Sequence, residues 1–302
     1  MNFVINHMTA PDLNWKQIIS MAKSSGCIGV ELRNDLPRQL FDGDEPSQVL
    51  AAAAKSNMRI VGLSQVYPFN AYSSEIEDKV KKLINSALEC GAETICLIPL
   101  NDGTCQGNAE RQANLRGALW EILTLLDGTG LIALIEPLGF LQSSLRTKEE
   151  AVSAIKDVGG QKIFKIVHDT FHHYLSGDEL YFPEYTGIVH ISGVTTADLS
   201  VHEMEDRHRV LVDHRDRIGN ITQLRTLLDM GYDGLISLEC FAPEVHASVD
   251  IQRDVQRTFE FIRSSLSDSS EMRDHSNSLN PGSIPDKTLV AGHQQLKCGR
   301  NT

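Results

Sequence analysis

The order of apolar segments limits the fold more strongly than any other feature of this 302-residue chain. Short apolar or β-branched runs alternate with longer amphipathic stretches almost from end to end. Eight runs have the length and composition of strands, at Phe3–Asn6, Ile28–Arg33, Ile60–Gln65, Thr94–Ile98, Leu131–Glu136, Ile163–Asp169, Gly187–Ser192 and Leu235–Glu239. Strands that alternate with helices are typical of βα units around a parallel sheet. The sequence therefore predicts an α/β protein.

Eight βα repeats can form a closed barrel or an open doubly wound sheet. No Gly-x-Gly-x-x-Gly turn follows the first predicted strand, so the phosphate-binding turn typical of a dinucleotide fold is missing. Several strands instead end in polar residues, which a barrel brings together on one face. We therefore expect a single (β/α)₈ TIM barrel over residues 1–264. From residue 265 apolar residues become rare and periodicity stops, so 265–302 are predicted to be a disordered tail.

The charge balance excludes several classes of partner. The chain has 28 Lys and Arg residues against 40 Asp and Glu residues, a net charge of −12. An acidic chain without a basic patch repels nucleic acid and anionic membrane surfaces, so we expect neither as a partner. Its apolar runs, such as Leu131–Ile135, are far shorter than the roughly 20 residues needed to cross a bilayer. The N-terminus has no secretory signal pattern, and a cytoplasmic protein is predicted.

The six cysteines lie far apart, without a Cys-x-x-Cys pair or the spacing of a structural zinc site. They are Cys27, Cys90, Cys96, Cys105, Cys240 and Cys298. In a reducing compartment each is interpreted as a small buried hydrophobic residue or an incidental thiol.

The last four predicted strands each deliver one charged or imidazole side chain at their carboxyl ends. These side chains are Glu136, Asp169, His190 and Glu239. In a barrel they would project into the same space, where three carboxylates and a histidine would repel one another unless a divalent cation held them. The sequence therefore predicts a site for one divalent metal ion. Three oxygen ligands and one nitrogen suit Mn²⁺, the ion we expect, and also Zn²⁺, Co²⁺ or Mg²⁺.

The segments around these residues resemble the xylose-isomerase-like TIM barrels of the sugar phosphate isomerase/epimerase superfamily, and within it most closely the inosose (2-keto-myo-inositol) isomerases. The segments that carry the resemblance are Ile135–Gly139, His168–His172, Val189–Ser192 and Ile236–Glu244. The resemblance covers about residues 1 to 264 and excludes the tail.

This resemblance implies roles for individual residues. Glu136, Asp169, His190 and Glu239 look like the family's four metal ligands, and the two glutamates also look like its acid/base pair. His172 matches the histidine of the family's Asp-x-x-His motif, which hydrogen-bonds a substrate oxygen.

A charged segment after the seventh predicted strand resembles the loop from which the family's arginine reaches a substrate oxygen. Arg209 best matches that arginine, but the family's Pro-Gly-x-Gly continuation is absent, and the choice between Arg207 and Arg209 stays open.

Further substrate contacts are predicted only from position on the catalytic face. Asn6 at the end of the first strand is one candidate, and Glu31, Arg33 and Gln65 are others. Three aromatic residues, Tyr67, Phe171 and Phe241, are candidates for the apolar walls of a site for a cyclic polyol. His168, next to Asp169 on one strand, should point to the opposite side and pack between barrel and helices.

The combined hypothesis is an enzyme, a metal-dependent isomerase of keto-polyols that interconverts inososes through an enediolate in inositol catabolism. Its substrate is a small-molecule polyol or sugar. Two alternatives use similar ligands: inosose or 3-dehydroshikimate dehydratase, and hydroxypyruvate isomerase or a ketose epimerase. An endonuclease-IV-like enzyme is disfavoured by the acidic charge, and a non-enzymatic barrel by the complete ligand set. Because related barrels often dimerise, a homodimer is a further expectation.

Overall fold

Eight parallel strands close into a barrel in the computed structural model, which describes the backbone of residues 1–277 and the side chains of residues 1–267. The strands are β1 (Asn2–Asn6), β2 (Gly29–Arg33), β3 (Arg59–Val66), β4 (Thr94–Leu97), β5 (Ile132–Ile135), β6 (Phe164–Asp169), β7 (Thr186–Ile191) and β8 (Leu235–Leu238). Each strand pairs with the next, and β1 pairs in parallel with β8, which closes the sheet. The predicted TIM barrel is confirmed, and every predicted strand lies within one residue of the observed one at each end.

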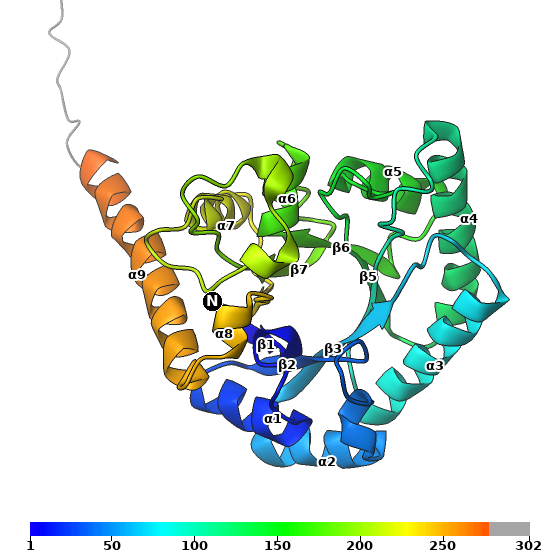
Figure 1. Ribbon diagram of the computed structural model, residues 1–302, viewed down its shortest axis with the longest axis horizontal. Helices are drawn as coiled ribbons and strands as arrows, with labels where there is room; N and C mark the ends of the chain where they lie inside the picture. Colours follow the sequence, from blue (N-terminus) through cyan, green and yellow to red (C-terminus); the bar gives the residue numbers. More distant parts are fainter. Residues whose placement is uncertain (278–302) are drawn as a thin grey trace, which may run out of the picture. The chain divides into compact units, whose positions relative to one another are not determined.

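Helices surround the strands on the outside (Figure 1). They are α1 (Trp15–Ser24), α2 (Pro46–Ser56), α3 (Ser74–Cys90), α4 (Asn108–Leu126), α5 (Lys148–Asp157), α6 (Thr170–Ser176), α7 (Asn220–Asp229), α8 (Pro243–His246) and α9 (Ile251–Asn277). Side-chain caps start several of them: Asn14 forms a capping box with Gln17 before α1, and the Thr147 hydroxyl accepts from the Glu150 amide at the start of α5.

Two apolar layers hold the barrel together. A small inner layer fills the barrel with one side chain from each of six strands, namely Val4, Val61, Cys96, Leu134, Val167 and Ile188. A larger layer packs the outer faces of the strands against the helices, and includes Phe3 of β1 stacked on Phe259 of α9 at 4.2 Å between ring centroids. The inner layer forms a floor, so any site must lie at one end of the barrel rather than in a pore.

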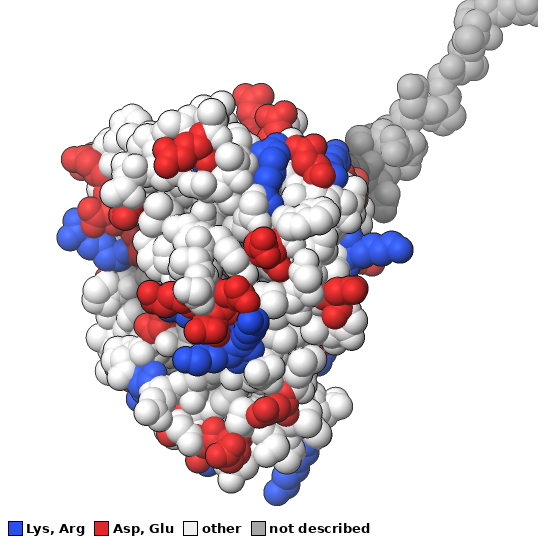
Figure 2. Space-filling view, turned by 90° about the vertical axis from the view of Figure 1, so that its right-hand side faces the viewer, with Lys and Arg blue, Asp and Glu red and all other residues white. Residues whose placement is uncertain are grey.

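The compact unit that holds the barrel extends from Met1 to Leu266. Helix α9 runs beyond residue 264, so the predicted tail 265–302 begins within this helix, and its part after residue 277 lies outside the described residues. Five of the six cysteines are free and buried, and Cys298 falls outside the described part. Among the described residues, no helix has the length and apolar character needed to span a membrane. On the face shown in Figure 2, Lys and Arg side chains are interspersed with Asp and Glu.

Candidate metal centre

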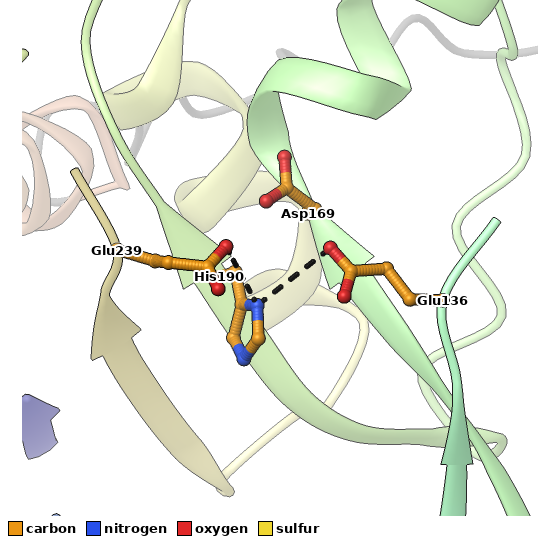
Figure 3. A group of neighbouring side chains, drawn as sticks. All are labelled: Glu136, Asp169, His190 and Glu239. Atoms are coloured by element: carbon orange, nitrogen blue, oxygen red, sulfur yellow. Dashed lines mark ion pairs between the residues drawn. The ribbon is translucent and has the colours of Figure 1, made fainter. Parts of the chain in front are cut away.

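Four side chains from the last four strands meet at the carboxyl end of the barrel. Glu136 follows β5, Asp169 ends β6, His190 lies on β7 and Glu239 follows β8. One ligand atom from each residue lies within 4.8 Å of the corresponding atoms of the other three, and all four residues are buried. We call these four residues the inner cluster. Figure 3 shows Glu239 and Glu136 reaching toward His190 from opposite sides, with Asp169 completing the group.

The orientation of His190 leaves one ring nitrogen for a cation. Its Nε2 lies 3.2 Å from Glu31 Oε1, so this nitrogen carries the hydrogen that Glu31 accepts. Its Nδ1 is buried, lacks a hydrogen-bond partner, and lies 3.3 Å from Glu239 Oε2 and 3.8 Å from Glu136 Oε1. Metal-binding histidines are fixed in this way by an acceptor at the other ring nitrogen. An unpartnered nitrogen aimed at two carboxylates fits a ligand to a divalent cation.

The spacing of the inner cluster also fits one ion. Oxygen and nitrogen ligands lie about 2.0–2.2 Å from ions such as Zn²⁺, so opposite ligand atoms are separated by up to about 4.4 Å. The observed limit of 4.8 Å requires only small side-chain adjustments. Donors of this type suit divalent cations that accept oxygen and imidazole ligands.

The electrostatics of the inner cluster favour a positive charge at its centre. Burial alone would lower the pKa of His190, but the charges of Glu31 and Glu239 outweigh burial and raise it well above its ordinary value. Burial would likewise raise the pKa of Glu239, but His190, Arg209 and Arg33 outweigh it and hold the pKa well below its ordinary value. Either a proton on His190 or a cation can therefore supply the charge that these carboxylates require.

Glu31 is part of the support of the site. Its carboxylate accepts hydrogen bonds from Asn6 Nδ2 at 3.3 Å and from the Ser237 hydroxyl, besides the bond to His190. Asn6, predicted as a substrate contact, is fully buried, and its Oδ1 accepts from the Met8 amide and from Arg33. In the structure, Glu31 and Asn6 hydrogen-bond other residues of the site, namely His190, Ser237 and Arg33. The sequence suggests that these two side chains contact substrate.

The structure separates the two candidate arginines. Arg209 is buried and donates to Asp169 and, at 2.8 Å, to Glu239 Oε2. Arg207 is exposed and pairs with Glu205 on the surface. Arg33, which the sequence marks only by its position, also reaches the site: its Nη1 lies 2.6 Å from Glu239 Oε1. Two guanidinium groups therefore flank the inner cluster.

A cavity of about 280 Å³ opens above the inner cluster. Its lining includes the glutamates Glu136 and Glu239, together with His172 and the aromatic residues Tyr67 and Phe241. His172 Nδ1 is buried without a hydrogen-bond partner, so it is available to a ligand. Two of the three predicted aromatic walls line this cavity.

The third predicted wall residue, Phe171, packs behind Arg209, with 5.2 Å between the guanidinium carbon and the ring centroid. The same segment contains helix α6, which begins at Thr170, where Asp169 Oδ1 caps it by accepting from the His172 amide at 2.9 Å. Asp169 therefore serves both as the cap of this helix and as a candidate metal ligand.

The sequence predicts a small hydrophobic residue or an incidental thiol at Cys96, but the structure places its sulfur 3.7 Å from Glu136 Oε2. Burial and the neighbouring Glu136 charge raise its pKa well above the ordinary value, so the sulfur stays a thiol and donates a weak hydrogen bond. Only its strand position, not its spacing from other cysteines, could indicate this contact.

A second buried polar group, the outer cluster, lies on the other side of β6 and consists of Lys148, His168, His173 and Gln223. Lys148 Nζ lies 3.0 Å from His168 Nδ1 and 2.7 Å from His173 Nδ1, while His168 Nε2 lies 3.0 Å from Gln223 Oε1. His168 is fully buried against α5 and α7, which confirms that it points away from the inner cluster.

Carboxylates and a histidine that converge at the strand ends of a closed eight-stranded barrel define a TIM barrel with a candidate divalent-metal centre. The chain belongs to the xylose isomerase-like TIM barrel family, whose model matches residues 19–265. The family resemblance seen in the sequence is therefore confirmed.

Solved structures agree with this assignment. A xylose isomerase domain-containing protein of Salmonella typhimurium is 30% identical, with a TM-score of 0.80 over 88% of this chain and 97% of that chain. The IolI protein, solved with a bound zinc atom, is 18% identical, with a TM-score of 0.79 over 89% of this chain and 99% of that chain.

D-psicose 3-epimerase of Clostridium cellulolyticum is also 18% identical, with a TM-score of 0.68 over 88% of this chain and 99% of that chain. At such identities these two likenesses show the fold alone. No curated protein sequence matches the chain significantly.

Proposed function

We propose that the protein is a metal-dependent isomerase of keto-polyols, with inososes as its principal substrates. The observation that carries this function is the placement of two glutamates. Glu136 and Glu239 line the cavity and flank His190 from opposite sides, so a ligand in the cavity lies between two carboxylates. The zinc-bound IolI structure and the epimerase with the same fold support a metal site and sugar chemistry for this barrel.

The inner cluster would hold the divalent cation, which we expect to be Mn²⁺, with Zn²⁺, Co²⁺ or Mg²⁺ as alternatives. Glu136, Asp169 and Glu239 offer carboxylate oxygens, and His190 offers the free Nδ1. When bound, such a cation stabilises negative charge that develops on neighbouring carbonyl and hydroxyl oxygens.

The protein's own groups then move the proton. Isomerising an α-hydroxyketone requires removal of a proton from the hydroxyl-bearing carbon and return of a proton to the neighbouring carbon through an enediolate. One cavity glutamate accepts the proton at a carboxylate oxygen, and the other faces the opposite side of the ligand. His172 Nδ1, which is buried without a partner in the cavity lining, would hydrogen-bond a substrate oxygen and fix the ring between them. Tyr67 and Phe241 would cover the carbon face of the ring.

Solvent exchange tests this function directly. The purified protein is incubated with Mn²⁺ in D₂O with a panel of inososes and neutral ketohexoses, and deuterium at the carbon next to the carbonyl is followed by NMR and mass spectrometry. We expect deuterium to enter an inosose without loss of water. Glu239→Gln should lower the exchange rate by about 10²–10⁴-fold, because it removes one of the two cavity carboxylates between which the proton moves.

Glu244→Gln is the matched control, since this exposed glutamate lies on α8 close to Glu239 in the sequence and outside the cavity lining. Its exchange rate should equal that of the wild type. No exchange into any inosose, or an unchanged rate in Glu239→Gln, would contradict the proposed function. Loss of water from the substrate would assign the protein to the dehydratases instead.

A further inference from the structure

The first cationic side chain of the cavity, Arg33, pairs with two carboxylates. Its Nε and Nη2 donate to the two oxygens of Asp35 at 2.8 Å and 2.7 Å, a bidentate pair. Its Nη1 donates to Glu239 Oε1 at 2.6 Å. Asp35 lines the cavity and is partly exposed, whereas Arg33 is buried. Asp35 therefore occupies two of the three nitrogens of this guanidinium at the cavity wall.

The second cationic side chain, Arg209, is occupied in the same way. Its Nη1 lies 3.3 Å from Asp206 Oδ1, its Nε donates to Ser192 Oγ at 3.0 Å, and its Nη2 donates to Asp169 and Glu239. The guanidinium carbon also lies 4.5 Å from the Phe241 ring centroid, so one face of the group is covered. Asp206 lines the cavity with nearly half of its side chain exposed. Asp35 lines the same cavity on the Arg33 side.

The charge balance of the cavity is therefore negative. Four carboxylates line it, those of Asp35, Glu136, Asp206 and Glu239, and Asp169 lies beside them in the inner cluster. Among the described residues, Arg33 and Arg209 are the lysines or arginines in the lining. Five negative charges exceed two guanidiniums and a divalent cation by one. A carboxylate or phosphate ligand would enter against this charge and would find both guanidiniums already paired.

Two buried polar atoms of the lining have no hydrogen-bond partner. Asn101 Oδ1 is buried and accepts no hydrogen bond, so it requires a donor such as a hydroxyl. His172 Nδ1 is likewise unpartnered. Hydroxyl groups satisfy both kinds of atom, because each can donate and accept. An anionic oxygen cannot donate to Asn101.

We propose that Asp35 and Asp206 are specificity-determining residues that occupy the two cavity arginines and thereby reserve the site for uncharged polyhydroxy ketones. This inference rests on the proposed function and narrows its substrate class. It excludes carboxylate-bearing substrates such as 3-dehydroshikimate or hydroxypyruvate, and it excludes sugar phosphates.

Binding of matched neutral and anionic ligands to the Mn²⁺-loaded protein tests the selection without catalysis. The first pair is myo-inositol and quinate, two cyclohexane polyols of which only quinate carries a carboxylate. The second pair is D-fructose and D-fructose 6-phosphate. Calorimetry should show that the wild type binds each neutral member at least tenfold more tightly than its anionic partner.

The variants Asp35→Asn and Asp206→Asn should each raise the affinity ratio of quinate to myo-inositol by about tenfold, because each frees guanidinium hydrogens and removes one negative charge. The double variant should raise it further. Glu205→Gln is the matched control: Glu205 lies next to Asp206 in the sequence but pairs with exposed Arg207, and the ratio should stay at the wild-type value.

Three results would overturn the selection: a wild type that binds the anionic member of a pair as tightly as the neutral one, a wild type that binds neither neutral ligand, or aspartate variants with an unchanged ratio. Failure of the proposed function looks different, because it is seen as the absence of deuterium exchange into inososes. Since D-fructose and myo-inositol are both neutral, charge selection can be confirmed for a protein that exchanges a ketohexose and no inosose.

Discussion

The two sides of strand β6 carry buried polar clusters of opposite character. The inner cluster consists of three carboxylates and one histidine, with Arg33 and Arg209 beside it. The outer cluster joins a lysine and two histidines to one glutamine amide, and the neighbouring carboxylate of Asp178 accepts from the backbone amides of Lys148 and Leu180. Adjacent residues of one strand, His168 and Asp169, belong to the two different clusters, because successive side chains of a strand point to opposite sides.

The two clusters relieve the cost of buried charge in different ways. In the inner cluster, His190 and the two guanidiniums hold the pKa of Glu239 well below its ordinary value, and the charges of Glu31 and Glu239 raise the pKa of His190. In the outer cluster burial lowers the pKa of Lys148 to about 7, and burial together with the Lys148 charge lowers that of His173 to about 4. The inner cluster therefore keeps a charge that can bind a cation, while the outer cluster loses protons and holds α5, β6 and α7 together.

The largest effect is expected from the support of the inner cluster. Glu31→Gln should weaken divalent-metal binding by about 10–100-fold. The carboxylate accepts from Ser237 and Asn6 at Oε2 and from His190 at Oε1, whereas an amide has only one accepting oxygen, so His190 loses its fixed orientation. Metal affinity by calorimetry measures the change. Glu77→Gln, an exposed residue of α3, is the control and should bind metal as the wild type does. Unchanged affinity in Glu31→Gln would show that Glu31 does not orient the histidine.

The outer cluster should make stability depend on pH. The pKa of Lys148 is about 7 in the folded protein against an ordinary value of 10.5, so the unfolded chain binds more protons between these values. Stability from this group therefore rises with pH above about 7, by up to about 1.4 kcal/mol per pH unit.

Urea unfolding of the wild type and of Lys148→Met at pH 6.5 and 8.5 measures this rise. The difference between the two proteins cancels the contributions of other titrating groups. The wild type should gain more stability than the variant between these pH values, and equal gains in both would mean that Lys148 titrates outside this window.

A neutral member of the outer cluster gives a smaller, pH-independent effect. Gln223→Leu should lower the free energy of unfolding by about 1–3 kcal/mol, because it leaves buried His168 Nε2 without its acceptor and the backbone oxygens of Thr170 and Ile218 without a donor. Thr222→Leu, exposed on the same helix, serves as a control for the change in side-chain type. Metal affinity of Gln223→Leu should stay close to that of the wild type. A loss of metal affinity as large as that expected for Glu31→Gln would show that the two clusters act as one unit.

The smallest effect is expected outside both clusters. Arg207→Ala should change stability and deuterium exchange within error, because this exposed side chain forms a surface ion pair with exposed Glu205. Arg209→Ala should lower the exchange rate, since it removes a buried charge that contacts Asp169 and Glu239. Equal effects of the two substitutions would contradict the structural choice between these arginines.

Much of the inner cluster could be predicted from the sequence, because its residues stand at the ends of regular strands. Glu136, Asp169 and Glu239 follow clear apolar runs, and parallel strands of a barrel place such ends on one face. The outward direction of His168 follows from the same two-residue repeat of a strand. Fold and candidate ligands therefore depend mainly on local pattern.

The rest depends on contacts between distant segments, which local pattern does not contain. Glu31 and Arg33 lie on β2, and their contacts with His190 and Glu239 appear only when β2 and β8 are both placed beside β1. Lys148 begins α5 as an ordinary charged residue of a first turn, and only packing of α5 against β6 makes it a buried base. The choice of Arg209 over Arg207 likewise required the path of the loop.

The central feature is a single metal ion held by the inner cluster. Metal titration of the wild type and of variants at two adjacent residues, His168 and Asp169, tests it. Protein stripped by a chelator is titrated with Mn²⁺ and with Zn²⁺ by calorimetry, and folding of each variant is checked by circular dichroism. We predict one ion per chain for the wild type and for His168→Gln, and binding weakened at least about 100-fold for Asp169→Asn. A wild type that binds no ion, or an Asp169→Asn protein that binds as tightly as the wild type, would contradict the account.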